Sequence, residues 1–409
     1  MFVKDCDATP WLWKADIDAA YRRIPIRPDQ RWAAWIAFVV GGVYFASGHV
    51  TMPFGATASV HAWNRVGALL CHIARRVLMA PVLRYVDDFF CIDFPECAKH
   101  TMDCFARIVR ALLGVSAVAE RKLDFGCPLV VLGLVVDVKS DRVRLWPTKD
   151  KTERWISRIQ GALDTKCLKP GMASKLAGAL NWTSQHIFRR LGRAMLRPLY
   201  YQQCRPSGRV GLKVDFCLRW WLEVLELELC QEQFFEDSNT GVVELFCDAR
   251  GFPARLAAVL FCDGEILYTD WEPPTELLQL FVYRGDNQIM GLELLSIALG
   301  LSTFRDQISG RNIRVWSDNV GCEKACKKGA SRKFDHNCIV HCLWLVAAQY
   351  GIGLHIERVT TDDNIADWPS RESYTVLAEL GAKWMVPFLE DTFWLPESWG
   401  SLRLRHTVL

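Results

Sequence analysis

The chain has 409 residues, of which 51% are apolar and 23% are charged, and its formal net charge is only +3. This composition is typical of a globular protein, and the length predicts two to four compact domains, each with its own core. Sixteen cysteines occur without a secretory signal at the N-terminus. We therefore expect reduced, buried thiols rather than disulfides, in an intracellular protein that is cytoplasmic or nuclear.

The first candidate site residue is Asp16, which ends a short Trp-rich apolar segment. Tyr21 follows five residues later, and we expect the intervening Asp18 to face away from Asp16 and to be solvated.

A stretch without Asp, Glu, Lys or Arg follows, from residue 33 to residue 63. Because Gly41-Gly42 and Pro53 interrupt it, the stretch is too irregular for a membrane span. We therefore predict a buried hairpin and no contact with a membrane.

Two adjacent carboxylates, Asp87 and Asp88, lie between apolar runs in a segment that reads as strand, tight turn, strand. Neighbouring anions repel each other, and natural sequences keep such a pair mainly where a divalent cation neutralises it. Oxygen-only ligands favour Mg²⁺ or Mn²⁺. An isolated Asp-Asp pair is also compatible with a solvated turn.

Three segments in this order resemble motifs A, B and C of reverse transcriptases: 15–26, 52–59 and 85–88. Two further segments, 120–126 and 131–137, are similar to motifs D and E. Each match alone is weak, whereas five in the right order over about 120 residues are specific as a set.

The resemblance implies an RNA-directed DNA polymerase that uses an RNA template, a DNA primer and deoxynucleoside triphosphates. Asp16, Asp87 and Asp88 would hold two Mg²⁺ or Mn²⁺ ions, which activate the primer hydroxyl and hold the departing pyrophosphate. Tyr21 would exclude the ribonucleotide 2′-hydroxyl, with a packed core tyrosine as the alternative. Further implied ligand contacts are those of Phe54 and Gly55 with template and nucleotide, and of Lys122 with pyrophosphate, unless Lys122 is simply exposed.

The middle of the chain is strongly basic. From Arg142 to Arg219 there are 17 Lys or Arg against four acids, a local charge of +13. We predict a helical thumb and connection that grips a nucleic-acid backbone, because phosphate contacts supply sequence-independent affinity. Candidate contacts are Lys149, Lys175, Arg190 and Arg193, with a solvated helix face as the alternative. Residues 173–182 also resemble the connecting helix of mobile-element transcriptases, particularly of the DIRS type.

Four acids in the second half each belong to a predicted element. Asp248 and Asp318 end strand-like runs, Glu293 lies in a helical pattern, and Asp367 lies in a helix near the end of this region. This order resembles the ribonuclease H domain of retrotransposon polyproteins. It implies that the four acids hold two Mg²⁺ or Mn²⁺ ions and cleave the RNA of an RNA/DNA hybrid, with Asn319 as an outer ligand. The alternative is that the acids cap helices and face water.

Two histidine and cysteine patterns are less specific. The mobile histidine of that family has its nearest candidate in His355, which lies on an apolar strand-like run and favours a structural role. Paired cysteines four residues apart lie near His336 and His341, but their spacing matches no zinc-binding motif.

The expected fold class is multidomain α/β. We predict an α+β reverse-transcriptase palm with partial fingers over 1–140, a helical thumb and connection over 141–240, and a mixed-sheet ribonuclease H-like domain over 241–372. The tail, 373–409, would pack on the nuclease domain.

Only 15 residues precede Asp16, so most of the family's fingers have no counterpart here and polymerase activity is in doubt. Two functions stay open. One is a retroelement reverse transcriptase with ribonuclease H; the other is a polymerase-deficient remnant that acts as a nuclease only or as a non-catalytic nucleic-acid-binding protein. The sequence does not determine the oligomeric state.

Overall fold

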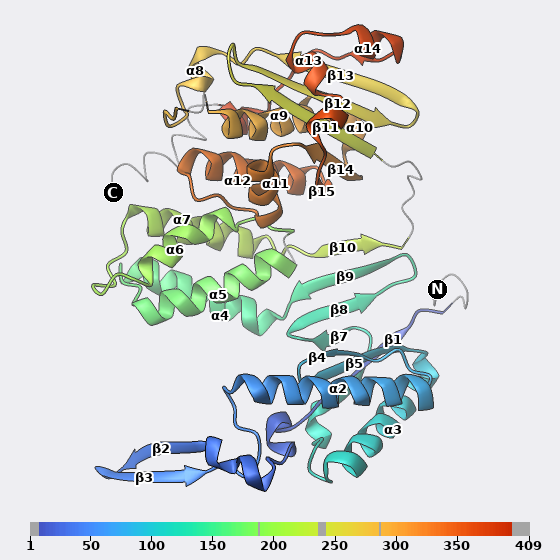
Figure 1. Cartoon of the computed structure of the whole chain (residues 1–409), viewed down its shortest axis with the longest axis vertical. Coiled ribbons are helices and arrows are strands. Elements are labelled where there is room, and N and C mark those ends of the chain that lie inside the picture. Colours follow the sequence, from blue (N-terminus) through green and yellow to red (C-terminus); the bar gives the residue numbers. More distant parts are fainter. Residues whose placement is uncertain (1–7, 187–188, 236–242, 286–287, 395–409) are drawn as a thin grey trace. The chain divides into compact units, whose positions relative to one another are not determined.

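The computed structural model describes residues 8–186, 189–235, 243–285 and 288–394. The chain divides into two compact units, one formed by residues 1–148 with 232–236 and the other by residues 149–231 with 237–409 (Figure 1). Both units combine helices with β-sheet, so the expected mixed α/β architecture with several sheets is present.

The first unit is built on a four-stranded antiparallel sheet of order β4-β5-β1-β6. Its strands are β1 (Trp11–Asp16), β4 (Leu83–Tyr85), β5 (Asp88–Asp93) and β6 (Leu123–Gly126). Two long helices, α2 (Thr57–Val77) and α3 (Pro95–Leu113), pack on the sheet. Their common core contains Trp13, Trp63, Phe89 and Phe105, none of which is exposed to solvent.

Short helical turns and a second sheet complete this unit. The 3-10 turns are η1 (Ala20–Arg23), η2 (Pro28–Ala33) and η3 (Glu120–Lys122). The second sheet has the order β10-β9-β8-β7, formed by β7 (Leu129–Val131), β8 (Leu134–Val138), β9 (Arg142–Pro147) and β10 (Gln231–Phe234). Glu232 on β10 binds Arg142 and Arg144 on β9 at 3.1 and 3.0 Å, so an ion-pair cluster reinforces the pairing of distant chain segments.

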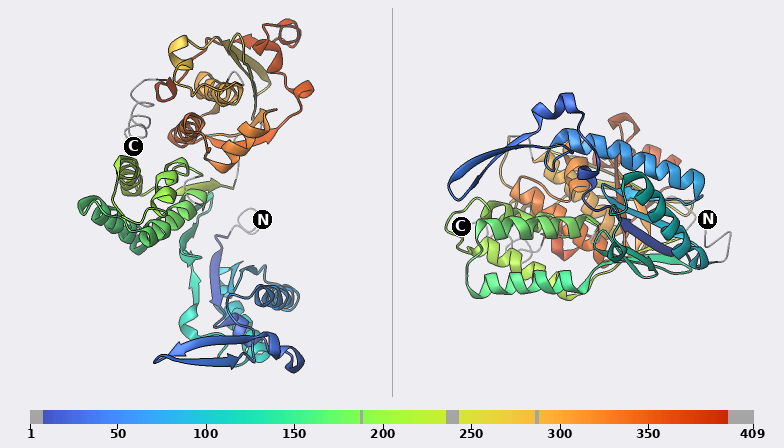
Figure 2. Two further views of the ribbon diagram at one scale, coloured as in Figure 1. Left: turned by 60° about the vertical axis from the view of Figure 1, so that its left-hand side comes forward. Right: turned by 90° about the horizontal axis from the view of Figure 1, so that it is seen from below.

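The charge-free stretch forms a hairpin, as predicted, but the hairpin is not buried. Strands β2 (Trp35–Val40) and β3 (Val43–Gly48) pair only with each other, and all their residues are exposed. Tyr44 is 84% exposed and Trp35 61%. The hairpin projects from its unit (Figures 1 and 2), and no described element covers either face. Apolar residues on both faces predict burial only if the fold supplies a second layer.

The second unit begins with a layer of helices. These are α4 (Lys149–Asp164), α5 (Pro170–His186), η4 (Ala194–Leu196), α6 (Arg197–Gln202) and α7 (Leu212–Glu226). Trp155 and Ile159 of α4, Leu180 of α5 and Trp221 of α7 are buried. The amphipathic stripes of these helices thus form a helical body, with their basic residues on the outer faces and in the loop after α5.

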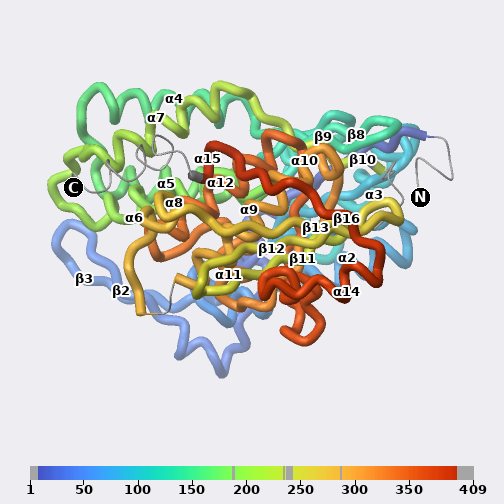
Figure 3. The backbone as a smooth tube through the Cα atoms, turned by 90° about the horizontal axis from the view of Figure 1, so that it is seen from above, coloured from blue at the N-terminus to red at the C-terminus, as the bar shows by residue number. Residues whose placement is uncertain are grey.

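A six-stranded mixed sheet follows, with the order β15-β14-β11-β12-β13-β16. Its strands β11, β12 and β13 run side by side in Figure 3. The strands are β11 (Val243–Arg250), β12 (Arg255–Cys262), β13 (Glu265–Trp271), β14 (Asn312–Ser317), β15 (Gly353–Arg358) and β16 (Lys383–Trp384). The first three are antiparallel, whereas β14 and β15 run parallel to β11. This mixed pattern places the C-terminal ends of β11 and β14 side by side.

Helices cover both faces of this sheet. Helix α9 (Ile289–Thr303) is buried from Gly291 to Ser302 and packs with α12 (Phe334–Gln349) in the main core. Leu377 of α14 (Thr375–Glu379) and Ala366, just before α13 (Asp367–Ser370), form a smaller core with Val259. The remaining short elements are α8 (Thr275–Leu278), α10 (Arg305–Ile308), α11 (Val320–Lys328), η5 (Thr361–Asp363) and α15 (Asp391–Trp394).

The C-terminal segment joins this unit through Leu389 and Phe393, which belong to the main core. Residues 395–409 lie outside the described residues. No helix in the described part of the chain is long and apolar enough to cross a membrane.

Candidate functional site

Three of the predicted acids meet at the sheet of the second unit. Phe246 on β11 is in register with Trp316 on the parallel strand β14. Asp248 and Asp318 each follow two residues later, so parallel pairing brings both acids to the same level. Glu293 comes from the second turn of α9. One carboxylate oxygen from each of Asp248, Glu293 and Asp318 lies within 4.8 Å of the other two.

Burial makes this cluster unfavourable without a counter-charge. Asp248 and Glu293 are 5% and 4% exposed. Burial raises the pKa of Asp248 to about 6, opposed by the Ser370 hydrogen bond and reinforced by the charge of Asp318. Burial and then the Asp248 charge raise the pKa of Glu293 well above its ordinary value. A divalent cation would replace the lost hydration of these carboxylates.

The Oε2 atom of Glu293 supports that interpretation, because it is buried and has no hydrogen-bond partner. Buried polar atoms are normally satisfied. An unsatisfied carboxylate oxygen among two further acids fits a hard divalent cation such as Mg²⁺ or Mn²⁺. The three acids therefore could hold a metal.

Asp367 lies outside this three-oxygen group. It is the first residue of α13, and Arg371 binds its carboxylate through Nε at 2.9 Å and through a terminal nitrogen at 2.7 Å. Asp318 is also held, since Thr361 donates a hydrogen bond to its Oδ2 at 2.7 Å. The fourth acid is thus near the end of the same sheet, but its charge is neutralised by an arginine one turn later.

Asn319 and His355 occupy simpler positions. The amide oxygen of Asn319 accepts hydrogen bonds from the backbone of Gly321 and Cys322 and caps α11. Its predicted role as an outer ligand remains a prediction. His355 is exposed on the edge strand β15, in register with Arg314.

Two polar residues at this site had no predicted role. The Ser370 hydroxyl donates to Asp248 Oδ2 at 2.5 Å, and the Asn364 amide donates to the carbonyl of Cys247 at 3.1 Å. Both residues are buried. Both residues lie within three positions of Asp367, and this closeness in sequence could have indicated a role at the site. Only the fold, however, brings this segment to β11.

The first unit places its predicted acids at the meeting point of two strands. Asp16 at the end of β1 is directly opposite Asp88 at the start of β5. The backbone of Ile17 donates to the carbonyl of Asp87 at 3.1 Å, which ties β1 to the Asp-Asp turn. Burial raises the pKa of Asp88, and the charges of Asp16 and Asp87 raise it further.

The turn itself has a left-handed residue, Val86, with φ 53°. A β-branched residue rarely adopts this conformation. Its carbonyl accepts hydrogen bonds from the Trp63 indole at 2.7 Å and from Arg84 at 2.9 Å, and these contacts hold the turn. These hydrogen bonds stabilise the strained turn and so fix the backbone that carries Asp87 and Asp88.

Lys122 contacts two of the acids of this unit. Its Nζ lies 3.0 Å from Asp16 Oδ2 and 3.2 Å from Asp18 Oδ1. Burial lowers the pKa of Lys122, but hydrogen bonds to Asp16 and Asp18 raise it and dominate. The expectation that Asp18 faces away from Asp16 is wrong, because Asp18 lies in the turn after β1 and its carboxylate shares Lys122 with that of Asp16.

Tyr21 and Phe54, two of the predicted substrate-binding residues, are in contact, and Gly55 follows Phe54 in the chain. The rings of Tyr21 and Phe54 meet edge to face, with centroids 5.2 Å apart. Phe54 is exposed, and Gly55 has φ 86°, a left-handed conformation that glycine adopts without strain. Their proposed contacts with template, sugar and nucleotide remain predictions.

The acids of the first unit do not form a three-oxygen group as compact as that of the second unit. Among the described residues, only Asp248, Glu293 and Asp318 have one oxygen each within 4.8 Å of the others. The cysteines and histidines of α11 and α12 form no such group within the described ranges either.

The predicted phosphate contacts differ in their surroundings. Lys149 is exposed and lies 3.8 Å from Glu153, and Lys175 is exposed on α5. Arg193 is partly buried. Arg190 instead packs within the unit: it donates to the carbonyl of Cys326 at 3.5 Å and lies over the Trp344 ring at 5.6 Å.

Burial consequently lowers the pKa of Arg190. A phosphate contact by this guanidinium would require it to leave Trp344, so the arrangement favours a packing role. Arg197 behaves similarly, because it donates to the carbonyls of Ser331 and Arg332. Arg190 in the loop after α5 thus binds α11 and α12, and Arg197 at the start of α6 binds the segment between those two helices.

Comparisons with known proteins give structural likenesses only. No protein-family model matches the sequence, and no curated protein matches it. A foamy viral protease-reverse transcriptase solved with an RNA/DNA hybrid is 15% identical, with a TM-score of 0.42, over 86% of this chain and 44% of that chain. A foamy viral protease-reverse transcriptase dRH solved with double-stranded DNA is 14% identical, with a TM-score of 0.41, over 87% of this chain and 58% of that chain. The chain therefore spans about half the length of these proteins.

Proposed function

We propose that the second unit is a ribonuclease H that uses divalent metal ions to cleave the RNA strand of an RNA/DNA hybrid. The convergence of Asp248, Glu293 and Asp318, with an unsatisfied buried oxygen on Glu293, carries this proposal. Asp248, Glu293 and Asp318 would hold the metal, with Asp367 close by on α13. Mg²⁺ or Mn²⁺ bound there would activate water and stabilise charge on the phosphodiester.

The protein's own groups would prepare this centre. Ser370 and Thr361 hold the carboxylates of Asp248 and Asp318 by hydrogen bonds, which limits the rotamers available to each ligand. Arg371 holds Asp367 until a cation competes for it. Exposed Lys149 and Lys175 would contribute non-specific attraction to the phosphate backbone.

We propose an RNA-directed DNA polymerase in the first unit as a second activity of the same retroelement-type protein. The direct opposition of Asp16 and Asp88 and the raised pKa of Asp88 favour it. RNA template, DNA primer and deoxynucleoside triphosphates would be its ligands, and Lys122 would neutralise pyrophosphate after release from Asp16. The alternatives are a protein with nuclease activity only and a non-catalytic protein that binds nucleic acid.

One experiment with two reciprocal variants separates these possibilities. The purified chain is incubated with a labelled RNA/DNA hybrid, and in parallel with a primed RNA template and deoxynucleotides, with Mg²⁺, with Mn²⁺ or with chelator. We expect Asp318→Asn to abolish RNA cleavage and to leave primer extension and hybrid binding unchanged. Asp88→Asn should abolish extension and leave cleavage intact, so each variant is the matched control for the other.

Cleavage by Asp318→Asn at the wild-type rate would overturn the nuclease assignment. Cleavage without extension in the wild-type chain would support a protein with nuclease activity only. Hybrid binding with neither activity would support the non-catalytic alternative. Each result concerns the full chain, in which both units are present.

A further inference from the structure

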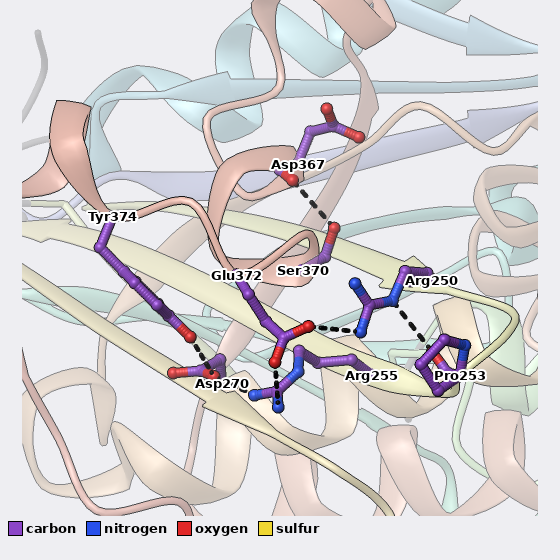
Figure 4. A network of polar contacts seen from close by, with 8 residues as sticks. All are labelled: Arg250, Pro253, Arg255, Asp270, Asp367, Ser370, Glu372 and Tyr374. Carbon is purple, nitrogen blue, oxygen red and sulfur yellow. Dashed lines mark hydrogen bonds and ion pairs between the residues drawn. The ribbon is translucent and has the colours of Figure 1, made fainter.

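Glu372 forms a polar network directly after the segment that carries Ser370 and Arg371. Its carboxylate accepts hydrogen bonds from Arg250 at 2.8 Å and from Arg255 at 3.0 Å (Figure 4). Arg250 ends β11 and Arg255 begins β12, and the two residues are in register. Glu372 therefore fastens the segment after α13 to the end of the strand that carries Asp248.

The arginine partners are themselves held in place. Arg250 donates to the carbonyl of Pro253 at 3.0 Å, and Arg255 binds Asp270 Oδ2 at 2.5 Å. Tyr374 donates to the same Asp270 oxygen at 3.0 Å. Glu372 is thus bound to arginines that have further partners of their own (Figure 4).

The backbone of Glu372 adopts an unfavourable conformation that its side-chain contacts must stabilise. Its φ is 63°, a left-handed conformation that is unfavourable for a residue with a Cβ atom. The backbone N–H of Glu372 donates to the carbonyl of Pro369 at 3.1 Å. The side-chain bonds to two arginines offset this cost and fix the turn that ends α13.

The same short segment supports the acidic centre. Ser370, two residues before Glu372, donates its hydroxyl hydrogen to Asp248 Oδ2, and its Oγ lies 3.0 Å from the carbonyl oxygen of Asp367. Figure 4 shows Ser370 between Asp367 and the arginine-bound Glu372. A shift of this segment would therefore change the contacts of both Asp248 and Asp367.

We propose that Glu372 is a positioning residue that sets the divalent-metal affinity of the nuclease centre. It acts through Ser370 on Asp248 and through the placement of α13 on Asp367, without touching the metal. This inference rests on the proposed ribonuclease H function. In this proposal, the Glu372 carboxylate keeps the metal ligands in the geometry that binds the cation.

The test measures Mn²⁺ binding to the full chain by electron paramagnetic resonance of free Mn²⁺ and by calorimetry. In parallel, the rate of hybrid cleavage is measured as a function of Mg²⁺ concentration. We expect Glu372→Gln to weaken Mn²⁺ binding about 10-fold, in the range for residues that orient metal ligands, and to raise the Mg²⁺ requirement for cleavage equally. Cleavage at saturating Mg²⁺ and the thermal midpoint should stay near those of the wild type.

A charge effect is separated from positioning by Arg250→Gln. Removing this positive charge would strengthen cation binding if only the long-range field mattered, whereas loss of the Glu372 contact should weaken it. Glu265→Gln is the matched control: its carboxylate binds Lys383 at 2.5 Å at the opposite end of β13, and Mn²⁺ affinity should not change.

The outcomes distinguish this inference from the function on which it rests. A wild-type chain that neither binds Mn²⁺ nor cleaves the hybrid would contradict the proposed function. A wild-type chain that does both, together with a Glu372→Gln variant of unchanged Mn²⁺ affinity, would overturn the positioning role alone. Opposite effects of Glu372→Gln and Arg250→Gln would also overturn it, because they would show a simple field effect.

Discussion

Replacing Asp248 by Asn should make the metal-free protein more stable while removing a proposed metal ligand. Asp248 is 5% exposed, and burial raises its pKa from 3.8 to about 6. This difference of about two pKa units corresponds to about 3 kcal/mol for ionising the buried group at neutral pH. Asn carries no charge, and its amide oxygen can still accept the Ser370 hydrogen bond.

The gain should depend on pH with a defined sign. Because the folded-state pKa is raised, the folded protein binds more protons than the unfolded chain between about pH 4 and pH 6. The stability of the wild type therefore falls as the pH rises through this window. Above it, the full free-energy cost of ionising the buried Asp248 carboxylate opposes folding. We expect Asp248→Asn to gain about 2–3 kcal/mol at pH 8 and almost nothing at pH 4.

The assay is calorimetric unfolding of the full chain in chelator at several pH values, followed through the transition of the second unit. The gain at pH 8 should raise that transition by roughly 4–12 °C. Asp306→Asn is the matched control, because the Asp306 side chain is 83% exposed and its removal should change stability little. Excess Mn²⁺ should stabilise the wild type and not the variant.

Two results would refute this reasoning. An Asp248→Asn variant that is no more stable than the wild type at pH 8 would show that the buried carboxylate carries no cost. An equal gain at pH 4 and pH 8 would show that the effect comes from packing and not from ionisation.

The remaining predictions concern the helical body. Gly192→Ala should destabilise the second unit by about 2–4 kcal/mol in calorimetry, because φ is 81° and a Cβ atom would lie 2.6 Å from the Trp221 ring. Gly178→Ala, in an open position on α5, should instead stabilise by up to about 1 kcal/mol, and equal effects would contradict the packing argument. Lys149→Gln and Lys175→Gln should each lower the slope of log affinity for a hybrid against log salt by about one. Arg190→Gln should mainly lower stability. Unchanged slopes for both lysine variants would reject the predicted contacts with the phosphate backbone.

Local sequence pattern was sufficient for the acids that end apolar strands. Asp248 and Asp318 come together because β11 and β14 pair in parallel, and each acid lies two residues beyond the paired Phe246 and Trp316. Asp16 and Asp88 face each other for a similar reason, since β1 and β5 pair in register. Strand periodicity and the positions of acids at strand ends are properties of neighbouring residues, so the sequence contains them.

The tertiary structure decided the partners of those residues. Ser370 meets Asp248 across 122 positions of the chain, Arg371 binds Asp367, which lies outside the three-oxygen group, and Trp344 packs on Arg190. The exposure of the hairpin around Tyr44 likewise depends on which layers are present. An arginine binds phosphate, carboxylate or an aromatic face with similar chemistry, and apolar residues bury only where another surface meets them. Which of these partners is available depends on contacts between distant segments, and composition and spacing do not contain that information.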